Sequence, residues 1–385
     1  MAPDIPTGIS IPETPSITHS ITGVPTLVSF LGTAAQGPTD QAILVTSWAD
    51  FQNQFGGFDP NSYLGYAISH FFANAGQQAY VVRLTDSNDG NAAAKSEQIK
   101  TGLQALDAVP AANLLAVPGE TDPATIAQLQ AYCAGRRAFL IVDSAADTTV
   151  AKLQNGLDSS MTGANAVNSA FYFPWVIAID PQQNVSRPFP PSGFVAGLYA
   201  ATDAERGVWK APAGVSAPIA GATDVAIHLS DADNATLNAH AVNCIKLFPS
   251  LGVMVWGART LAGNDQATSN WQYVSVRRLA LYIETSLIDD TRWATFEPND
   301  QRLWSQLNRS AGAFMQALFA QGAFHGATAA ESYFVECDEQ NNSPSSIEQG
   351  IVNITIGFAP MKPAEFVVIQ IKQMAGQSGG SQFSG

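Results

Sequence analysis

Up to about residue 180, short apolar runs alternate with stretches in which apolar residues recur at helical spacing. Residues 114–117 and 139–142 are continuous apolar runs, which is typical of parallel strands covered on both faces. We therefore expect an α/β layer. Its predicted strands are 26–32, 42–46, 79–84, 113–117, 138–143 and 171–180, and its predicted helices are 48–55, 63–74, 92–109, 124–135, 148–161 and 194–204.

Beyond residue 250 the pattern changes to longer amphipathic helices. One predicted helix places Val276, Leu279 and Ile283 on one face, and a second begins at a cap formed by Asn299 or Asp300. The second helix has an apolar stripe of Leu303, Leu307, Phe314 and Leu318. Strands are predicted at 253–260, 333–337, 352–358 and 365–372. The change predicts a domain boundary near residue 250, followed by an α+β unit.

The last predicted strand has two apolar faces. Residues 365–371 are apolar at both odd and even positions, whereas 352–358 alternate cleanly between apolar and polar. An unpaired apolar edge promotes aggregation, so this strand needs a partner. Two partners satisfy that need: the sheet of its own domain, which periodicity alone favours, or a neighbouring subunit.

Charged residues are scarce in this chain. They make up 13% of the 385 residues, against about 25% in a typical soluble domain. The centres of large permanent interfaces are depleted in charge, so this composition favours a self-assembling protein. The alternative is a monomer rich in small uncharged residues. The length itself predicts two domains, or three.

The charge and the hydropathy also limit the partners. The formal net charge is −14 and the 18 Lys and Arg form no run, which argues against direct binding of nucleic acid. We expect no secretory signal and no membrane insertion, because no segment approaches the ~20 apolar residues of a spanning helix. Cys133, Cys244 and Cys337 are widely spaced in apolar surroundings, which indicates folding in a reducing cytoplasm.

No group of residues has the pattern of a catalytic or metal site. None of the histidines has a second ligand at metal spacing; they are His19, His70, His228, His240 and His325. A Gly-x-Ser-x-Gly pattern at 376–380 lies in a Gly/Ser/Gln-rich tail, not on a strand-to-helix turn. Asp143 ends a predicted parallel strand, where open sheets bind ligands, but alone it is better explained as a turn or cap residue. We therefore predict no enzymatic activity, no cofactor and no metal.

Several segments together resemble one protein family. Residues 45–51 read VTSWADF and close on the FGG of 55–57, and 190–214 run from PPSGFVAGLYA to TDAERGVWKAPAG. Further matching segments are 255–261, 276–278, 296–300 and 363–368. In this order, and across residues 26–373, the sequence resembles the contractile tail sheath proteins.

This resemblance implies a structural subunit whose six-membered rings stack helically around an inner tube and contract to drive it through a target envelope. It implies an outer α/β domain at 26–250, similar to subtilisin without its catalytic triad, and an inner α+β domain at 251–372. Residues 1–25 would form an N-terminal arm and 373–385 a flexible tail. The implied partners are further copies of the chain, an inner tube protein, and baseplate and terminal cap proteins.

Sheath proteins of this family exchange the N-terminal arm and the C-terminal strand between neighbouring subunits. The corresponding residues here are Gly8, Ile9, Ser10 and Ile11 in the arm and Phe366, Val367, Val368, Ile369 and Ile371 in the last strand. Pro12 departs from the family's arm pattern and removes a backbone donor. We therefore expect a donated strand of only about four residues.

The second amphipathic helix after residue 250 is the candidate for the surface that faces the tube. The candidate residues on it are Arg302, Leu303, Gln306, Arg309 and Ala313. The alternative is that the two arginines are simply solvated.

Two other classes of function remain open at this point. One is a non-contractile shell or adhesin subunit, and the other is a degenerate subtilisin-like hydrolase, which needs a His and a Ser near Asp143. A sheath would be assembled in the bacterial cytoplasm, as part of a phage tail or of a released extracellular particle. The ending QIKQMAGQ at 370–377 resembles the extracellular injection particles more closely.

Overall fold

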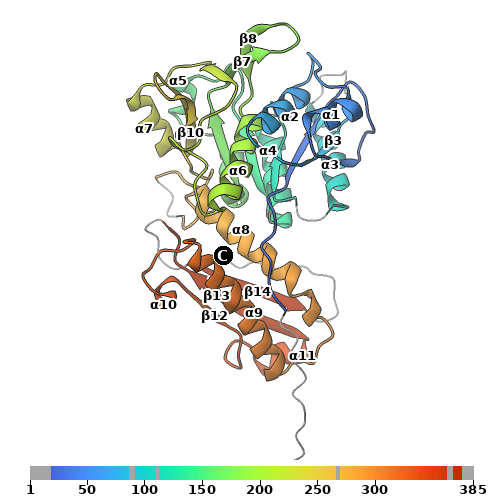
Figure 1. Cartoon of the computed structure of the whole chain (residues 1–385), viewed down its shortest axis with the longest axis vertical. Coiled ribbons are helices and arrows are strands. Elements are labelled where there is room, and N and C mark those ends of the chain that lie inside the picture. The colour runs from blue at the N-terminus through green and yellow to red at the C-terminus, as the bar shows by residue number, and fades with distance from the viewer. Residues whose placement is uncertain (1–18, 86–91, 110–111, 266–268, 362–366, 375–385) are drawn as a thin grey trace, which may run out of the picture.

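The computed structural model describes residues 19–85, 92–109, 112–265, 269–361 and 367–374. The chain forms two lobes joined at a narrow waist, and helix α8 (Val274–Asp290) runs from the waist along the second lobe (Figure 1). We call the lobe built mainly from residues 28–255 the upper lobe and the one built from residues 274–374 the lower lobe.

An eight-stranded sheet forms the centre of the upper lobe, in the order β11-β10-β6-β5-β4-β1-β3-β2. The six strands from β10 to β3 are parallel, and β11 and β2 add an antiparallel strand at each edge. The strands are β1 (Val28–Gly32), β2 (Ala42–Val45), β3 (Ala79–Arg83), β4 (Leu114–Ala116), β5 (Phe139–Asp143), β6 (Ser169–Phe173), β10 (Val242–Phe248) and β11 (Gly252–Val255).

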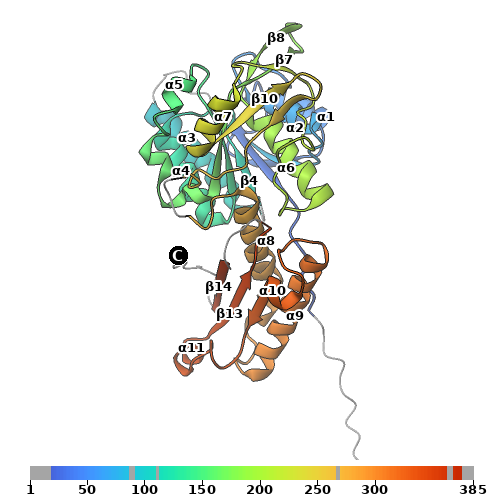
Figure 2. The same ribbon diagram turned by 90° about the vertical axis from the view of Figure 1, so that its left-hand side faces the viewer.

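Helices cover both faces of this sheet, as the apolar runs predicted. Phe30 packs in one core cluster and the next residue, Leu31, in the other. Helices α2 and α6 contribute to the first cluster and α3 and α4 to the second, so they lie on opposite sides (Figure 2). The helices are α1 (Trp48–Phe55), α2 (Leu64–Ala73), α3 (Ala92–Asp107), α4 (Pro123–Arg136), α5 (Val150–Leu153), α6 (Ser192–Arg206) and α7 (Asp231–Ala239), with short 3-10 helices η1 (Ser159–Thr162) and η2 (Ala164–Asn168).

A second, three-stranded sheet stands at the top of the upper lobe (Figure 1). It consists of β7 (Val176–Asp180), β8 (Val185–Phe189) and β9 (Ala222–Val225), all antiparallel, with β7 in the middle. Its β7–β8 hairpin projects away from the lower lobe.

Four sequence expectations in the upper lobe are wrong or incomplete. The predicted strand 171–180 is two strands, β6 and β7, because Pro174 between them has no N–H to continue the ladder. The predicted helix 148–161 stops at Leu153, and Gly156 adopts a left-handed φ of 89° soon after. The predicted strand 253–260 ends at Val255. The strands β8, β9 and β10 and the helix α7 were not predicted.

The lower lobe packs two long helices against a small antiparallel sheet. The sheet has the order β12-β13-β14. The elements of the lower lobe are α8, η3 (Arg292–Ala294), α9 (Gln301–Ala320), α10 (Ala329–Ser332), β12 (Tyr333–Glu336), α11 (Pro344–Glu348), β13 (Ile351–Phe358) and β14 (Val367–Met374). In β13 the alternate residues Val352, Ile354, Ile356 and Phe358 are buried, which confirms the predicted alternation, and Gly357 is buried as well.

Helix α9 begins as its sequence predicts. The Asp300 carboxylate accepts hydrogen bonds from the backbone N–H groups of Arg302 and Leu303, each at 3.0 Å, which caps the helix. Its apolar stripe, Leu303, Leu307, Ala311, Phe314 and Leu318, is buried in the core of the lower lobe.

The domain boundary expected near residue 250 falls between β10 and β11. These strands pair antiparallel from Ile245↔Val255 to Phe248↔Gly252, so a division there would separate two strands of one sheet. The connection between Val255 and Val274 leads from this sheet to the lower lobe, and the domain limits of 26–250 and 251–372 stay predictions.

Candidate assembly interface

A buried ion pair joins the two lobes at the waist. Arg278 of α8 donates to both carboxylate oxygens of Asp203 on α6, and the two side chains are only 6% and 5% exposed. The Arg278 guanidinium also lies 4.7 Å from the centre of the Tyr199 ring, and the Tyr199 hydroxyl is 2.7 Å from that of Tyr172. Removal of either partner would leave the other charge buried without compensation, which is costly in free energy of unfolding.

A second connection is made by residues 19–27, which we call the N-terminal strap. It runs along α8 to the start of β1 (Figure 1). The Thr22 N–H donates to Asp290, the Val24 N–H donates to Ser286, and Gly23 lies against Tyr282. Because these three α8 residues are spaced by four, they form one face of the helix.

The ends of the strap are also held. The His19 ring stacks on Trp293 with ring centroids 3.9 Å apart. At the other end, the Thr26 hydroxyl donates to Asp203 at 2.6 Å, so the strap reaches the ion pair of the waist. The expected arm of residues 1–25 thus includes a part, from His19 onward, that is packed on its own subunit.

The strand predicted to be exchanged lies at the edge of the lower sheet. β14 pairs with β13 of the same chain in an antiparallel register from Ile351↔Met374 to Phe358↔Val367. Val367, Val368, Ile369 and Ile371 belong to this strand, whereas Phe366 and the segment from Gly8 to Ile11 lie outside the described residues. Among the described strands none pairs with the other side of β14, so β14 is an edge strand of the described sheet.

Most of the predicted tube-facing residues share one exposed surface of α9. Arg302, Arg309 and Ala313 are exposed and Gln306 is half-buried. Leu303 was wrongly included, because it is only 3% exposed and belongs to the buried stripe of the same helix. At about 100° per residue, positions 302, 306, 309 and 313 share a sector of about 60°, and position 303 lies about 90° from the centre of that sector. The helical pattern alone could therefore have placed Leu303 with the buried stripe.

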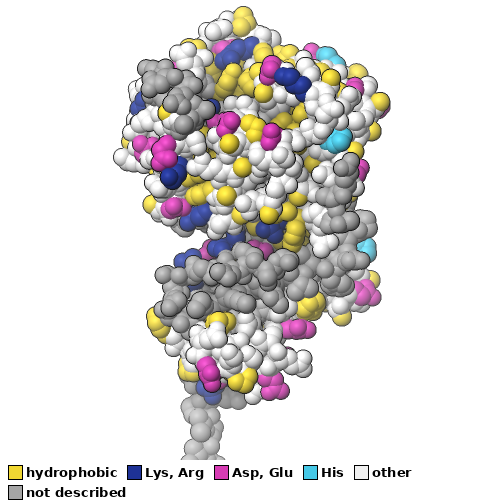
Figure 3. Space-filling view, turned by 180° about the vertical axis from the view of Figure 1, so that it is seen from behind, with side chains coloured by type: hydrophobic (Ala, Val, Ile, Leu, Met, Phe, Trp, Pro, Cys, Tyr) yellow, Lys and Arg dark blue, Asp and Glu magenta, His cyan; other side chains and the backbone are white. Residues whose placement is uncertain are grey.

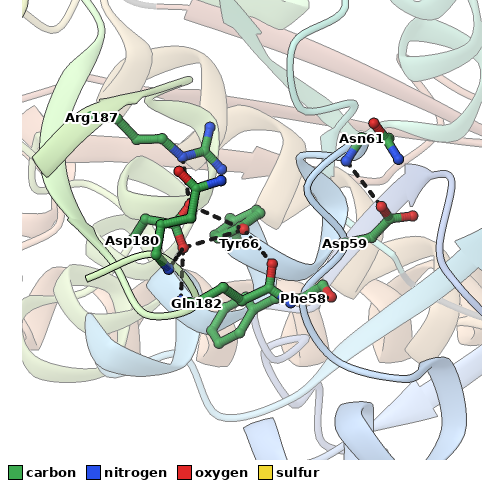
Figure 4. Close-up of polar contacts among 8 residues, drawn as sticks. Phe58, Asp59, Asn61, Tyr66, Asp180, Gln182 and Arg187 are labelled. Carbon is green, nitrogen blue, oxygen red and sulfur yellow. Dashed lines mark hydrogen bonds and ion pairs between the residues drawn. The ribbon is translucent and has the colours of Figure 1, made fainter. Parts of the chain in front are cut away.

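The hairpin β7–β8 is an exposed feature that the sequence pattern did not reveal. Near the turn of the hairpin Arg187 donates to Asp180 at 2.7 Å, and the Arg187 guanidinium lies over the Tyr66 ring of α2 (Figure 4). The Gln182 side chain donates to the Phe58 carbonyl at 2.9 Å. Burial acts to raise the pKa of Asp180, but the hydrogen bonds from Arg187 and from the backbone outweigh it and hold that pKa below its usual range. The hairpin is therefore rigidly attached, although Ile179 and Val185 on it are exposed.

The strongest catalytic candidate of the sequence is a buried structural residue. Asp143 accepts hydrogen bonds from the Ser192 N–H and hydroxyl, both at 2.7 Å, and from the Gly119 N–H at 2.9 Å. It thereby holds the first residue of α6, in agreement with a capping role. Complete burial raises its pKa to about 6, against the opposing effect of the three donors. The sequence pattern did not reveal the contact between Asp143 and Ser192, because the two residues are 49 positions apart in the chain.

The Asp143–Ser192 contact is buried and has no histidine partner among the described hydrogen bonds. Both side chains are buried, and among the histidines, all of which lie in the described part of the chain, none hydrogen-bonds to either residue. The described residues contain no group of three or more His, Cys, Asp and Glu placed to hold a metal ion. No helix among them is long and apolar enough to cross a membrane.

The surface is poor in charge, as the composition predicts. Seen from behind, acidic and basic side chains are scattered over the upper lobe, and several Lys and Arg gather at the waist (Figure 3). A two-lobed chain with an open strand edge, a strapped terminus and few charges has the features of a subunit of an ordered assembly.

Comparison with known proteins gives the family. Residues 92–261 match the phage tail sheath protein central domain, and residues 266–374 match the phage tail sheath C-terminal domain. The chain is 27% identical over 350 residues to a putative prophage major tail sheath protein of Pseudomonas aeruginosa. The aligned region covers 87% of this chain and 86% of that protein. The chain belongs to the phage tail sheath family.

Solved structures of contractile sheaths have the same fold over nearly the whole chain. The helical sheath of the anti-feeding prophage in its contracted state superposes with a TM-score of 0.75 at 28% identity, covering 97% of this chain and 100% of that one. The sheath of the extracellular contractile injection system PVC, also contracted, gives 0.72 at 27% identity, covering 97% and 98%. These similarities confirm the prediction of a contractile sheath protein over the shell, adhesin and hydrolase alternatives.

Proposed function

We propose that copies of this chain form six-membered rings that stack helically around an inner tube, and that contraction of the stack drives the tube through a target envelope. The observation that carries this proposal is the similarity to the anti-feeding prophage sheath, which extends over 97% of this chain and all of that subunit. A chain similar over its full length retains both lobes and the connections between them.

In this arrangement the upper lobe is the outer domain and the lower lobe lies next to the tube. The upper lobe has the parallel sheet, covered on both faces, that a subtilisin-like domain requires. The exposed face of α9 with Arg302 and Arg309 then points to the tube. Baseplate and terminal cap proteins are the proposed partners at the two ends of the stack, and assembly takes place in the bacterial cytoplasm.

Strand exchange supplies the links between copies. The β13–β14 ladder extends over eight residue pairs, and the same hydrogen bonds form whether β14 comes from its own chain or from a neighbour. Such an exchange costs little in contact energy, which is why identical elements are readily swapped between protomers. The arm segment from Gly8 to Ile11 is the proposed second exchanged strand.

The arm is tested by deletion of residues 1–12. Sheaths purified from cells that also express the tube and baseplate are imaged by electron microscopy, and we expect long striated sheaths from the wild type and none from the deletion. Deletion of residues 376–385 is the matched control and should leave assembly intact. Normal sheaths from the 1–12 deletion would rule out the arm as a link.

The C-terminal strand is tested by a disulfide across the ladder. Asn353 and Lys372 are opposite each other in the register, so Asn353→Cys together with Lys372→Cys can form a cross-link. If β14 is exchanged, oxidised sheaths give a ladder of covalent multimers on a denaturing gel. A monomer band alone, with the disulfide formed, means that β14 remains on its own subunit.

The tube-facing surface is tested by charge reversal. Arg302→Glu with Arg309→Glu should prevent sheath formation on the tube while leaving the fold intact, because both side chains are exposed. Lys100→Glu with Lys152→Glu, two exposed upper-lobe sites, is the matched control. Sheaths that assemble on the tube with both arginines reversed would contradict this assignment.

We further propose that the particle is an extracellular injection particle and not a phage tail. This rests on the ending at 370–377 and on the near-complete structural similarity to the anti-feeding prophage and PVC sheaths. Particles isolated from the culture medium should lack DNA-filled heads when imaged. Sheaths attached to such heads would establish the phage tail instead.

A further inference from the structure

Phe296 is exposed to an unusual degree for an aromatic residue. Its side chain is 87% exposed, the highest value among the large hydrophobic residues in the described part of the chain, of which Val215 at 66% is next. Its backbone has a φ of +77°, in the left-handed region that bulky residues rarely adopt. Neither feature benefits an isolated subunit, and strain of this kind concentrates at binding sites.

The loop that presents Phe296 is held firmly between η3 and α9. The Thr295 N–H donates to the Arg292 carbonyl at 3.1 Å and the Glu297 N–H to the Ala294 carbonyl at 3.2 Å. Asn299 then fixes the loop on both sides. Its amide donates to the Ile351 carbonyl at 3.0 Å, and its side-chain oxygen accepts from the Trp304 indole at 2.8 Å. The exposure of Phe296 is therefore built into the loop.

The first and the last described residues of the chain both lie in this same region. Trp293, three residues before Phe296, is stacked by His19, where the strap begins. Ile351, which Asn299 contacts, pairs with Met374, the last residue of β14. Eighteen further residues precede His19 and eleven follow Met374 in the sequence. Segments able to link one copy to another thus start beside Phe296.

The occupant that fits this arrangement best is a second copy of the chain. The 18 residues before His19 span up to about 60 Å when extended, enough to reach an adjacent subunit, and they include the apolar Ile9 and Ile11. A tube protein is the competing occupant. The candidate tube surface, however, is the arginine-bearing face of α9, whereas Phe296 lies in the preceding loop between the exposed Glu297 and the half-buried Thr295.

We infer that Phe296 is an aromatic anchor through which the lower lobe binds a second copy of this chain. The ring becomes buried against the neighbouring subunit on assembly, and the rigid loop preorganises it for that contact. The inference rests on the proposed sheath function and adds a specific contact to it. It assigns a function to a residue that the isolated fold does not use.

The first test replaces Phe296 by Asn, which tolerates a left-handed φ. The purified subunit should unfold at the same temperature as the wild type or higher, whereas the yield of sedimentable sheath should fall at least tenfold. Phe296→Tyr retains the ring and should assemble normally. Val215→Asn, the matched control at an exposed apolar site of the upper lobe, should also assemble normally.

The second test identifies the occupant. Phe296→p-benzoylphenylalanine in assembled sheaths should, on irradiation, give a product of twice the subunit mass that contains only this chain. A cross-link to another protein, or none at all, overturns the inference. If the wild type forms no sheath, the proposed function fails; if the wild type and Phe296→Asn form sheaths equally well, only this inference fails.

Discussion

In the upper lobe, six parallel strands lie between two core clusters, and both are filled by helices of the same chain. In the lower lobe, a three-stranded sheet ends in β14, and the strap is held on α8 by polar contacts and on η3 by one aromatic stack. The difference indicates that the two lobes have different roles. The sheet of the upper lobe is covered on both faces by its own chain, whereas the lower lobe carries the surfaces that we propose link copies, so substitutions in the two lobes should affect different measurements.

The largest effect is expected where the lobes meet. Asp203→Ala leaves the Arg278 charge buried without its partner, and we expect the free energy of unfolding to fall by about 3–5 kcal/mol. Urea unfolding of the full chain measures this. Asp203→Leu combined with Arg278→Met removes both charges and should cost clearly less. A wild-type midpoint for Asp203→Ala would mean that the lobes are not held together here.

The pH dependence of the free energy of unfolding tests whether Asp143 is buried in the upper lobe of a single copy. Burial raises the pKa of Asp143 to about 6, above the ~3.9 of an unfolded aspartate, so the folded state binds this proton more tightly. The stabilising contribution of this group is therefore full below about pH 4 and is lost as the pH rises through about 6, by up to about 3 kcal/mol. Urea midpoints at pH 4, 5, 6 and 7 should show this fall for the wild type and not for Asp143→Asn.

At neutral pH, Asp143→Asn has two opposing effects on the free energy of unfolding. It removes a buried charge, which stabilises the fold, and its amide nitrogen accepts no hydrogen bond, so the backbone N–H of either Ser192 or Gly119 loses its acceptor. We expect the two effects to offset each other to within about 1 kcal/mol, and thermal unfolding measures the difference. Sheaths should still form below the unfolding temperature, because the upper lobe is not the proposed site of strand exchange; failure to assemble in this variant would weaken the comparison.

A smaller effect is expected in the strap. In Gly23→Val the added Cβ would overlap the Tyr282 hydroxyl, so the strap or the Tyr282 side chain must shift and the contact between them is lost. Stability should fall by about 1 kcal/mol, and the Thr22 and Val24 amides should exchange with solvent at least tenfold faster. Gly312→Ala on α9, where nothing lies within 4 Å of the added atom, is the control and should be neutral or stabilising.

The smallest effect on folding is expected from Arg302→Glu with Arg309→Glu. Both side chains are exposed, and the free energy of unfolding should change by less than about 0.5 kcal/mol. A larger loss would mean that the arginines support the lobe itself, and assembly results from this variant would then carry no information about the tube.

The sequence predicted what local pattern controls. The buried apolar runs, the stripe of α9 and the cap at Asp300 are encoded by neighbouring residues, and the structure confirms them. Strand β10 was missed because Asn243 and Lys246, both buried, interrupt its apolar run. Polar residues in a core are stabilised by distant partners, such as Asp231 for Lys246, and a pattern of neighbours does not show them.

The candidate surfaces also divide into those that a local pattern determines and those that depend on distant residues. The face of α9 could be predicted apart from Leu303, because a helical period determines it. The contact of Asp143 with Ser192, the strap on α8 and the exposure of Phe296 join or isolate residues through the tertiary fold, and periodicity holds no information about them.

Within the described residues, the chain passes between the lobes through the strap and through the connection from β11 to α8. The Arg278–Asp203 pair lies where both of these segments meet α6, because Thr26 of the strap and Arg278 of α8 donate to the same carboxylate. Any change in the tilt of one lobe against the other therefore has to move a charge pair that is shielded from water, and such a movement is costly unless both charges move together.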